Sequence, residues 1–166
     1  MQVFTPKEPR KITQKNRKLA GLLRNPQVAS WRLLMSAYQV NYSIFEEAIS
    51  AEGLSYARFQ ILYLLYFEGA TSASCLAQHL FVSRANMSTF CKRLEKDNLV
   101  KQVAVKKGSK RTEYVLTKGG NSLFEKIFVA HIRRVKKSIP AFTLKTTSEL
   151  KNITRNHECK EDYFDN

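Results

Sequence analysis

The side chains best suited to specific chemistry lie between Ser83 and Arg93. Met87, Cys91 and Leu94 recur there at helical spacing, which predicts a helix with one buried face. The other faces carry polar and basic groups, namely Arg84, Asn86, Ser88, Thr89, Lys92 and Arg93. Arginine and asparagine suit guanine and adenine edges in the major groove of DNA, while cations contact phosphates. We therefore expect base contacts from Arg84 and Asn86, and phosphate contacts from Lys92 and Arg93.

A second basic group follows this predicted helix. Two short alternating runs, around Val103 and Val115, predict the strands of a β-hairpin. The residues between the runs are almost wholly basic and include Lys106, Lys107, Ser109, Lys110 and Arg111. From residue 84 to residue 111 the chain has nine basic side chains and two acidic ones. This one-sided charge favours a polyanion as the partner, because a solvated surface usually mixes both signs.

Other chemistry has weaker support in the sequence. Cys75 and His79 are four residues apart, and His157 and Cys159 form a second pair, but no carboxylate cluster accompanies them. Cys91 falls on the apolar face of its predicted helix, so we expect an inert thiol there. The chain has no nucleophile-elbow motif, no glycine-rich phosphate loop and no paired carboxylates in an apolar setting. We therefore expect no metal, no cofactor and no enzymatic activity.

Helices dominate the elements that would position these side chains. Asn25-Pro26 predicts the start of a long amphipathic helix that ends at Gly53. Further helix starts are predicted at Ser55, Ser72, Ser83, Thr117 and Thr146, the last with a capping box to Glu149. The helix after Ser55 is apolar almost all round and should be buried, and the helix after Thr117 should stop before Pro140. Asn98 stands where a left-handed residue would end a helix.

The composition agrees with a polyanion-binding protein that folds around a core. The chain has 166 residues, of which 28 are Lys or Arg and 14 are Asp or Glu, and its net charge is +14. Hydrophobic residues make up 43%, which is enough for a core. Three cysteines cannot form a paired disulfide framework, and no window approaches the roughly 18 apolar residues of a membrane span. We expect a soluble, cytoplasmic protein with no membrane partner.

Between Leu54 and Gly120 the chain resembles the MarR family of transcriptional regulators (the multiple antibiotic resistance regulators). The resemblance rests on Leu54-Ser55, on Ser72 with Leu76-Ala77, on residues 82–88 and 93–96, on Leu99-Val100 and on residues 116–119. It implies a mainly α fold with a small β-hairpin wing, a winged helix-turn-helix flanked by long N- and C-terminal dimerisation helices. It also implies a homodimer that places one recognition helix per subunit in the major groove of double-stranded DNA.

The resemblance further implies a repressor that a small anionic or phenolic effector releases. Family members hold phenolic effectors between the dimerisation helices and the DNA-binding lobe, and residues of this chain could line such a pocket. These are Trp31, Tyr38, Tyr42, Phe59, Tyr63 and Tyr66, with Arg58 as a counter-charge. An aromatic stripe at helical spacing is also typical of a core. Gly108 and Lys110 replace the Asp and Arg of a common wing motif, so recognition of minor-groove shape should weaken.

These interpretations give a division of the chain and a set of DNA-contacting residues. We expect a basic N-terminal arm at residues 1–24, a dimerisation helix at 25–53, the DNA-binding domain at 54–117, and dimerisation helices with an acidic tail at 118–166. The expected DNA contacts are Ser72, Ser83, Arg84, Ala85, Asn86, Ser88, Thr89, Lys92, Arg93, Lys106, Lys107, Ser109, Lys110 and Arg111. The expected function is sequence-specific regulation at a pseudo-palindromic operator. The alternative is a non-specific basic nucleic-acid-binding protein, architectural or RNA-associated.

Overall fold

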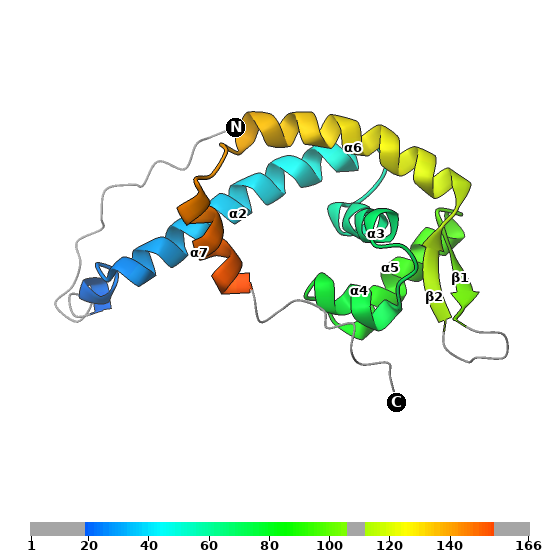
Figure 1. The fold of residues 1–166 in the computed structure, drawn as a ribbon, viewed down its shortest axis with the longest axis horizontal. Helices are drawn as coiled ribbons and strands as arrows, with labels where there is room; N and C mark the ends of the chain where they lie inside the picture. The colour runs from blue at the N-terminus through cyan, green and yellow to red at the C-terminus, as the bar shows by residue number, and fades with distance from the viewer. Residues whose placement is uncertain (1–18, 106–111, 155–166) are drawn as a thin grey trace. The chain divides into compact units, whose positions relative to one another are not determined.

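The computed structural model describes residues 19–105 and 112–154, which are mostly helical (Figure 1). The described residues fall into two compact units, which divide between Ile44 and Phe45. The elements are α2 (Pro26–Ser50), α3 (Tyr56–Phe67), α4 (Ala73–His79), α5 (Arg84–Lys96), β1 (Val100–Ala104), β2 (Thr112–Leu116), α6 (Lys118–Ser138) and α7 (Leu144–Thr154). Among the described residues, no helix combines the length and the apolar character needed to cross a membrane.

Helix α2 begins where the Asn25-Pro26 signal predicts. The Asn25 side-chain oxygen accepts hydrogen bonds from the backbone N–H groups of Gln27 (2.9 Å) and Val28 (3.3 Å). The helix ends at Ser50, and the chain turns at Gly53, whose φ of +80° suits glycine. Large apolar side chains on α2 within the first unit are exposed, including Trp31 at 61% and Leu33 at 72%.

A serine caps the N-terminus of each of the next three helices, as the sequence predicts. Ser55 accepts from the Arg58 N–H at the start of α3, Ser72 from the Cys75 N–H at α4, and Ser83 from the Asn86 N–H at α5. The chain leaves α5 through Asn98, whose φ of +54° is the predicted left-handed stop. The predicted helix after Ser55 is confirmed, and five of its apolar side chains are buried. The expectation of burial all round is only partly met, because Tyr63, Tyr66 and Phe67 are exposed.

The predicted hairpin forms with strands β1 and β2. They pair antiparallel with Val100 opposite Leu116 and Ala104 opposite Thr112. Thr71 bridges to Tyr114 through two backbone hydrogen bonds of 3.1 Å and 2.8 Å, which attaches the segment before α4 to the hairpin. The expected basic tip at residues 106–111 lies outside the described residues.

Helix α6 confirms one prediction, and α7 corrects another. Thr117 caps α6, which ends at Ser138, before Pro140, as expected. Helix α7 was predicted to start at Thr146, which is wrong, because the helix begins at Leu144. The Thr143 hydroxyl accepts from the Thr146 N–H at 3.2 Å, and the Thr143 carbonyl accepts from the Thr147 N–H at 2.9 Å. Thr143 therefore takes the capping role three residues earlier than expected.

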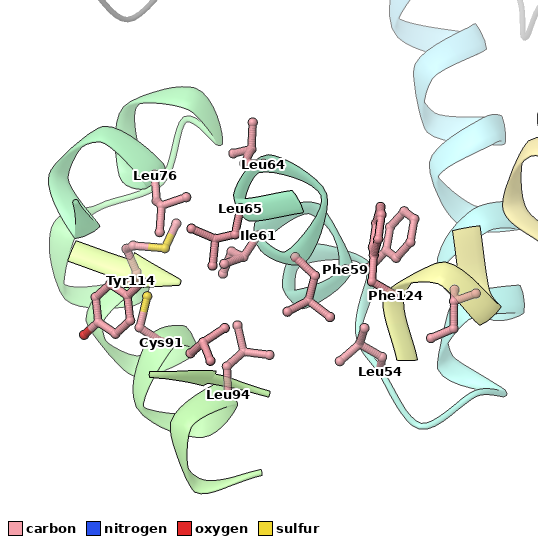
Figure 2. Packing of buried hydrophobic residues seen from close by; sticks show 14 of the residues in the cluster. Leu54, Phe59, Ile61, Leu64, Leu65, Leu76, Cys91, Leu94, Tyr114 and Phe124 are labelled. Atoms are coloured by element: carbon pink, nitrogen blue, oxygen red, sulfur yellow. The ribbon is translucent and has the colours of Figure 1, made fainter. Parts of the chain in front are cut away.

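One apolar core joins α3, α4, α5, the hairpin and α6. Figure 2 shows Ile61 and Leu65 on α3 pointing toward Leu76 of α4 and Cys91 of α5. At the other side of α3, the ring of Phe59 stacks on Phe124 of α6 with ring centroids 5.5 Å apart. Burial of this apolar surface holds α5 against the core by its inner face. The outer face of the helix is left exposed to solvent and can contact a ligand.

Candidate nucleic-acid interface

Helix α5 separates a buried face from a polar face in the way that the sequence predicts. Met87, Cys91 and Leu94 are fully buried against the core. The predicted contact residues on this helix are exposed, apart from Ser88, which is half-buried; the exposed ones are Arg84, Ala85, Asn86, Thr89, Lys92 and Arg93. An α-helix with one free polar face fits the major groove of B-DNA.

Capping fixes the first turn of α5. The Asn86 N–H donates to the Ser83 hydroxyl at 3.2 Å, and the Met87 N–H donates to the Ser83 carbonyl at 3.0 Å. Thr89 donates its hydroxyl to the Ala85 carbonyl at 3.1 Å, so this threonine is tied to its own helix while its side of the helix stays exposed. The backbone near Arg84 and Asn86 is therefore held in place before any ligand arrives.

The charge on α5 is distributed for contact with an anion. The first turn has no acidic residue, so no side-chain charge there offsets the positive end of the helix dipole. Arg93 and Lys96 lie in the last turn, and Lys92 precedes them. The exposed face thus combines a positive helix end with side-chain cations.

Lys96 extends this face and is not among the contact residues predicted from the sequence. It is exposed, and it follows Ala85, Thr89 and Lys92 at steps of three and four residues. Side chains at this spacing lie on the same side of a helix. The periodicity of the polar residues, read through to the end of the helix, would have identified it.

Buried neighbours support α5 from behind. Burial raises the pKa of the Cys91 thiol to about 11, with a smaller effect from Glu95, so the protonated thiol is favoured at neutral pH. Burial also raises the pKa of Tyr114, whose hydroxyl accepts a 3.1 Å hydrogen bond from the Gln102 amide. Gln102 also donates to the Glu95 carboxylate at 3.4 Å, which connects β1 to α5.

The remaining predicted contact residues lie beside α5 or outside the described chain. Ser72 caps α4 by accepting the Cys75 N–H at 3.2 Å and is half-buried, so its hydroxyl already has a structural role. The five predicted contacts of the hairpin tip lie outside the described residues, namely Lys106, Lys107, Ser109, Lys110 and Arg111.

The expected effector residues fall into two groups that belong to different units. Trp31, Tyr38 and Tyr42 lie on α2 within residues 19–44, and the rings of the two tyrosines are 5.8 Å apart. The other four are on α3, where they have neighbours of their own. Phe59 is buried in the core, Arg58 pairs with Asp97, Tyr66 donates to Glu125 at 2.9 Å, and Tyr63 packs 4.9 Å from Phe67.

Cys75 and His79, which have the spacing of metal ligands, are not part of a metal site in the part of the chain that the structure describes. His79 lies 3.6 Å from the Glu68 carboxylate, and no group of three or more metal-ligating side chains occurs among those residues. His157 and Cys159 lie outside them.

This geometry defines a class of protein, the winged helix-turn-helix proteins. Helix α3 packs behind the pair α4 and α5, the turn between them is tight, and the hairpin follows directly. The outward helix, α5, is the second of the pair, as in other proteins with a recognition helix.

Comparison with known proteins identifies a family within the winged helix-turn-helix proteins that this chain resembles. Residues 54–105 match the model of the MarR family. Among solved structures, the transcriptional regulator BldR from Sulfolobus solfataricus is similar over 86% of this chain and 98% of its own, with 18% identity and a TM-score of 0.68. A MarR family transcriptional regulator from Streptomyces coelicolor, solved in complex with DNA, is similar over 90% of this chain and 89% of its own, with 19% identity and a TM-score of 0.66.

A third solved structure is a MarR family protein of Mycobacterium tuberculosis in complex with salicylic acid. The similar region spans 75% of this chain and 92% of the Mycobacterium tuberculosis chain, with 24% identity and a TM-score of 0.57. No curated protein matches the chain. The chain therefore has the winged-helix fold of the MarR family regulators, and its sequence matches that family over the helix-turn-helix and the first strand.

Proposed function

We propose that this protein is a sequence-specific, double-stranded DNA-binding transcriptional regulator. The observation that carries the proposal is the outer face of α5. The core holds the helix by Met87, Cys91 and Leu94, while Arg84 and Asn86 are exposed at its capped start. Arginine and asparagine side chains at this end of a recognition helix have the hydrogen-bonding groups to distinguish guanine and adenine. The likeness to a regulator solved with DNA supports the same reading.

The proposed active form is a homodimer. Exposed apolar side chains on α2 within residues 19–44 include Trp31, Leu33 and Val40, and Leu144 at the start of α7 is 91% exposed. Large apolar surfaces of this kind usually meet a partner, and most soluble oligomers are symmetric dimers. In this proposal, residues 25–53 and 118–166 form the dimer and residues 54–117 bind DNA. The basic arm at 1–24 contacts either phosphates or the partner subunit.

A symmetric dimer predicts a symmetric operator. Two recognition helices in successive major grooves require half-sites about one helical turn apart, roughly 10 bp or 34 Å. We further propose that the protein is a repressor and that a small anionic or phenolic effector releases it. The likeness to a protein solved with salicylic acid supports this part.

Selection of bound sequences from a random pool of double-stranded DNA tests the proposal. The expected result is a pseudo-palindrome, bound at least about a thousandfold more tightly than unrelated DNA at the same salt concentration. Light scattering on the same sample should give the mass of a dimer. Uniform recovery of sequences would instead indicate the alternative, a non-specific basic nucleic-acid-binding protein. A monomer, or an unsymmetrical short site, would contradict the dimeric arrangement.

A further inference from the structure

The first turn of α3 makes two polar contacts with other elements. The Tyr56 N–H donates to the Glu46 carboxylate of α2 at 2.8 Å. Two residues later, the Arg58 guanidinium donates to the carboxylate of Asp97, the C-cap residue of α5. One helical turn therefore connects the end of α2 with the end of the candidate recognition helix.

In the Arg58–Asp97 pair, each charge lies at the end of its own helix where the helix dipole disfavours it. A cation is disfavoured in the first turn of a helix, and an anion is disfavoured at its C-terminal end. Arg58 lies in the first turn of α3, and Asp97 ends α5. Each residue would be better placed at the opposite end of its helix if the pair had no other role. Their mutual contact compensates for this placement and indicates that the position of the contact matters.

The pair holds the end of α5 that is far from the capped start. The side chain of Arg58 is only 14% exposed, so the guanidinium is fixed by the α3 side, whereas Asp97 is 48% exposed. On the other side, the Thr117 hydroxyl donates to the Asn98 carbonyl at 2.7 Å, which ties the same end to α6. Because α5 spans about 20 Å, small shifts at this end tilt the whole recognition helix.

We propose that Arg58 is a positioning residue for DNA recognition, which sets the angle of α5 against α3 and, because the Tyr56 N–H in the same turn of α3 bonds to Glu46, against the end of α2. This inference rests on the proposed function. In a dimer joined through α2, the angle of each α5 decides how far apart the two recognition helices lie. Arg58 then determines the half-site spacing that the protein accepts, while the exposed side chains of α5 determine the bases.

The test uses the full-length protein and the pseudo-palindrome recovered by selection. Its central spacer is shortened or lengthened by one base pair, and binding is measured at one salt concentration. The natural chain should prefer one spacing. In Arg58→Gln and in Asp97→Asn, the preference between spacings should fall by about threefold to thirtyfold, the usual range for loss of a coupling contact. The base preference within each half-site should stay unchanged.

Rescue and control variants separate positioning from general loss of structure. The exchange Arg58→Asp with Asp97→Arg keeps the pair and places both charges favourably for the helix dipoles, so it should restore the spacing preference. Lys126→Gln breaks a 3.0 Å ion pair between α6 and Glu52 without touching α5, and it should keep the natural preference. Thermal unfolding of each variant confirms that the fold is retained.

The outcomes distinguish this inference from the proposed function. If the natural chain recovers no specific sequence, the proposed function is wrong and the inference falls with it. If the natural chain recovers a site but Asp97→Asn and Arg58→Gln keep the same preference for one spacing, Arg58 has no positioning role and the proposed function stands. A charge exchange that folds but leaves the spacing preference lost would also overturn the inference.

Discussion

Gly120 packs directly against the backbone carbonyl of Leu99, so closely that no Cβ fits between them. The contact lies where the first turn of α6 crosses the chain just before β1, and the Thr117 N–H donates to the same carbonyl at 3.0 Å. The Leu99 oxygen belongs to the backbone and cannot move aside as a flexible side chain would. Glycine is therefore required here for close approach of two backbones.

The first prediction compares two neighbouring glycines. Gly120→Ala should lower the free energy of unfolding by about 1–3 kcal/mol, because the methyl group overpacks the contact with Leu99. Gly119→Ala should be neutral or stabilising by up to about 1 kcal/mol, since a Cβ there meets its nearest atoms at 3.7 Å and alanine favours helices. Urea unfolding measures both. Equal effects of the two substitutions on the free energy of unfolding would show that the close contact with Leu99 does not require glycine at position 120.

The second prediction concerns His131 on α6, whose imidazole packs edge-on against Phe45 and Phe59 with ring centroids 4.8 Å and 5.0 Å away. Burial, and then the nearby Arg134 guanidinium, lower the pKa of His131, so the folded chain favours the neutral ring. The unfolded chain takes up the proton near pH 6.5. The stability from this residue is thus present above that pH and is lost as the pH falls below it.

The measurement is the free energy of unfolding between pH 7.5 and 5.5. His131 contributes a slope of at most about 1.4 kcal/mol per pH unit, because one proton is involved. His131→Phe keeps an aromatic ring and removes the titration, so its stability should depend less steeply on pH than that of the natural chain. Parallel pH profiles for the two proteins would mean that His131 keeps its ordinary pKa.

The third prediction separates the roles of the side chains on α5. Arg84→Ala and Asn86→Ala should each cost roughly 1–3 kcal/mol on the selected site and should relax the base preference at one position. Lys92→Ala and Lys96→Ala should weaken binding to all sequences alike, and each should lower the slope of log affinity against log salt by about 0.9. A changed base preference in the lysine variants, with none in the other two, would reverse these roles.

The fourth prediction uses the cap of α5. Ser83→Asp keeps an oxygen acceptor for the Asn86 N–H, but it adds a negative charge at the end of the helix that would face DNA. Affinity for DNA should fall at low salt while the melting temperature changes little. Thr143→Asp makes the same change at the cap of α7, where the Thr143 hydroxyl accepts from the Thr146 N–H, and serves as the control, with little expected effect on binding. Equal losses in both variants would show that α5 does not lie nearest the phosphates.

The fifth prediction concerns Cys91 behind the recognition helix. Its pKa of about 11 leaves almost no thiolate at pH 7.5, and its side chain is buried, so iodoacetamide should modify it only after unfolding. Mass spectrometry of peptides from folded and urea-treated protein measures this. Fast alkylation of Cys91 in the folded protein would show that α5 opens frequently.

The elements of the fold could be predicted from local signals that act over three or four residues. Ser55, Ser72, Ser83 and Thr117 all cap helices as their positions indicate, because a hydroxyl before an apolar periodic run satisfies the free N–H groups of the first turn. Thr146 failed as a cap because Thr143 offers the same group earlier, and two equivalent hydroxyls cannot be ranked from sequence alone.

Contacts between distant residues could not be predicted in the same way. Arg58 was interpreted as a counter-charge for an effector, yet its partner in the folded chain is Asp97, 39 positions away. The left-handed conformation of Phe81 is another case, since phenylalanine rarely adopts a φ of +52°. The tight turn from α4 to α5 imposes it, and such a constraint becomes visible only when both helices pack on the same core.

Two left-handed residues bracket the recognition helix, Phe81 before its cap and Asn98 after its end. These turns fix where the helix starts and stops, and the buried inner face fixes its rotation about its own axis. The outer positions, such as Arg84, Asn86 and Thr89, take little part in that framework. Substitutions there can change the target sequence at small cost to folding, whereas inserting one residue would rotate the outer face by about 100°. Under the proposed function, the helix is an exchangeable module, on which new DNA specificities can evolve or be engineered while the scaffold stays the same.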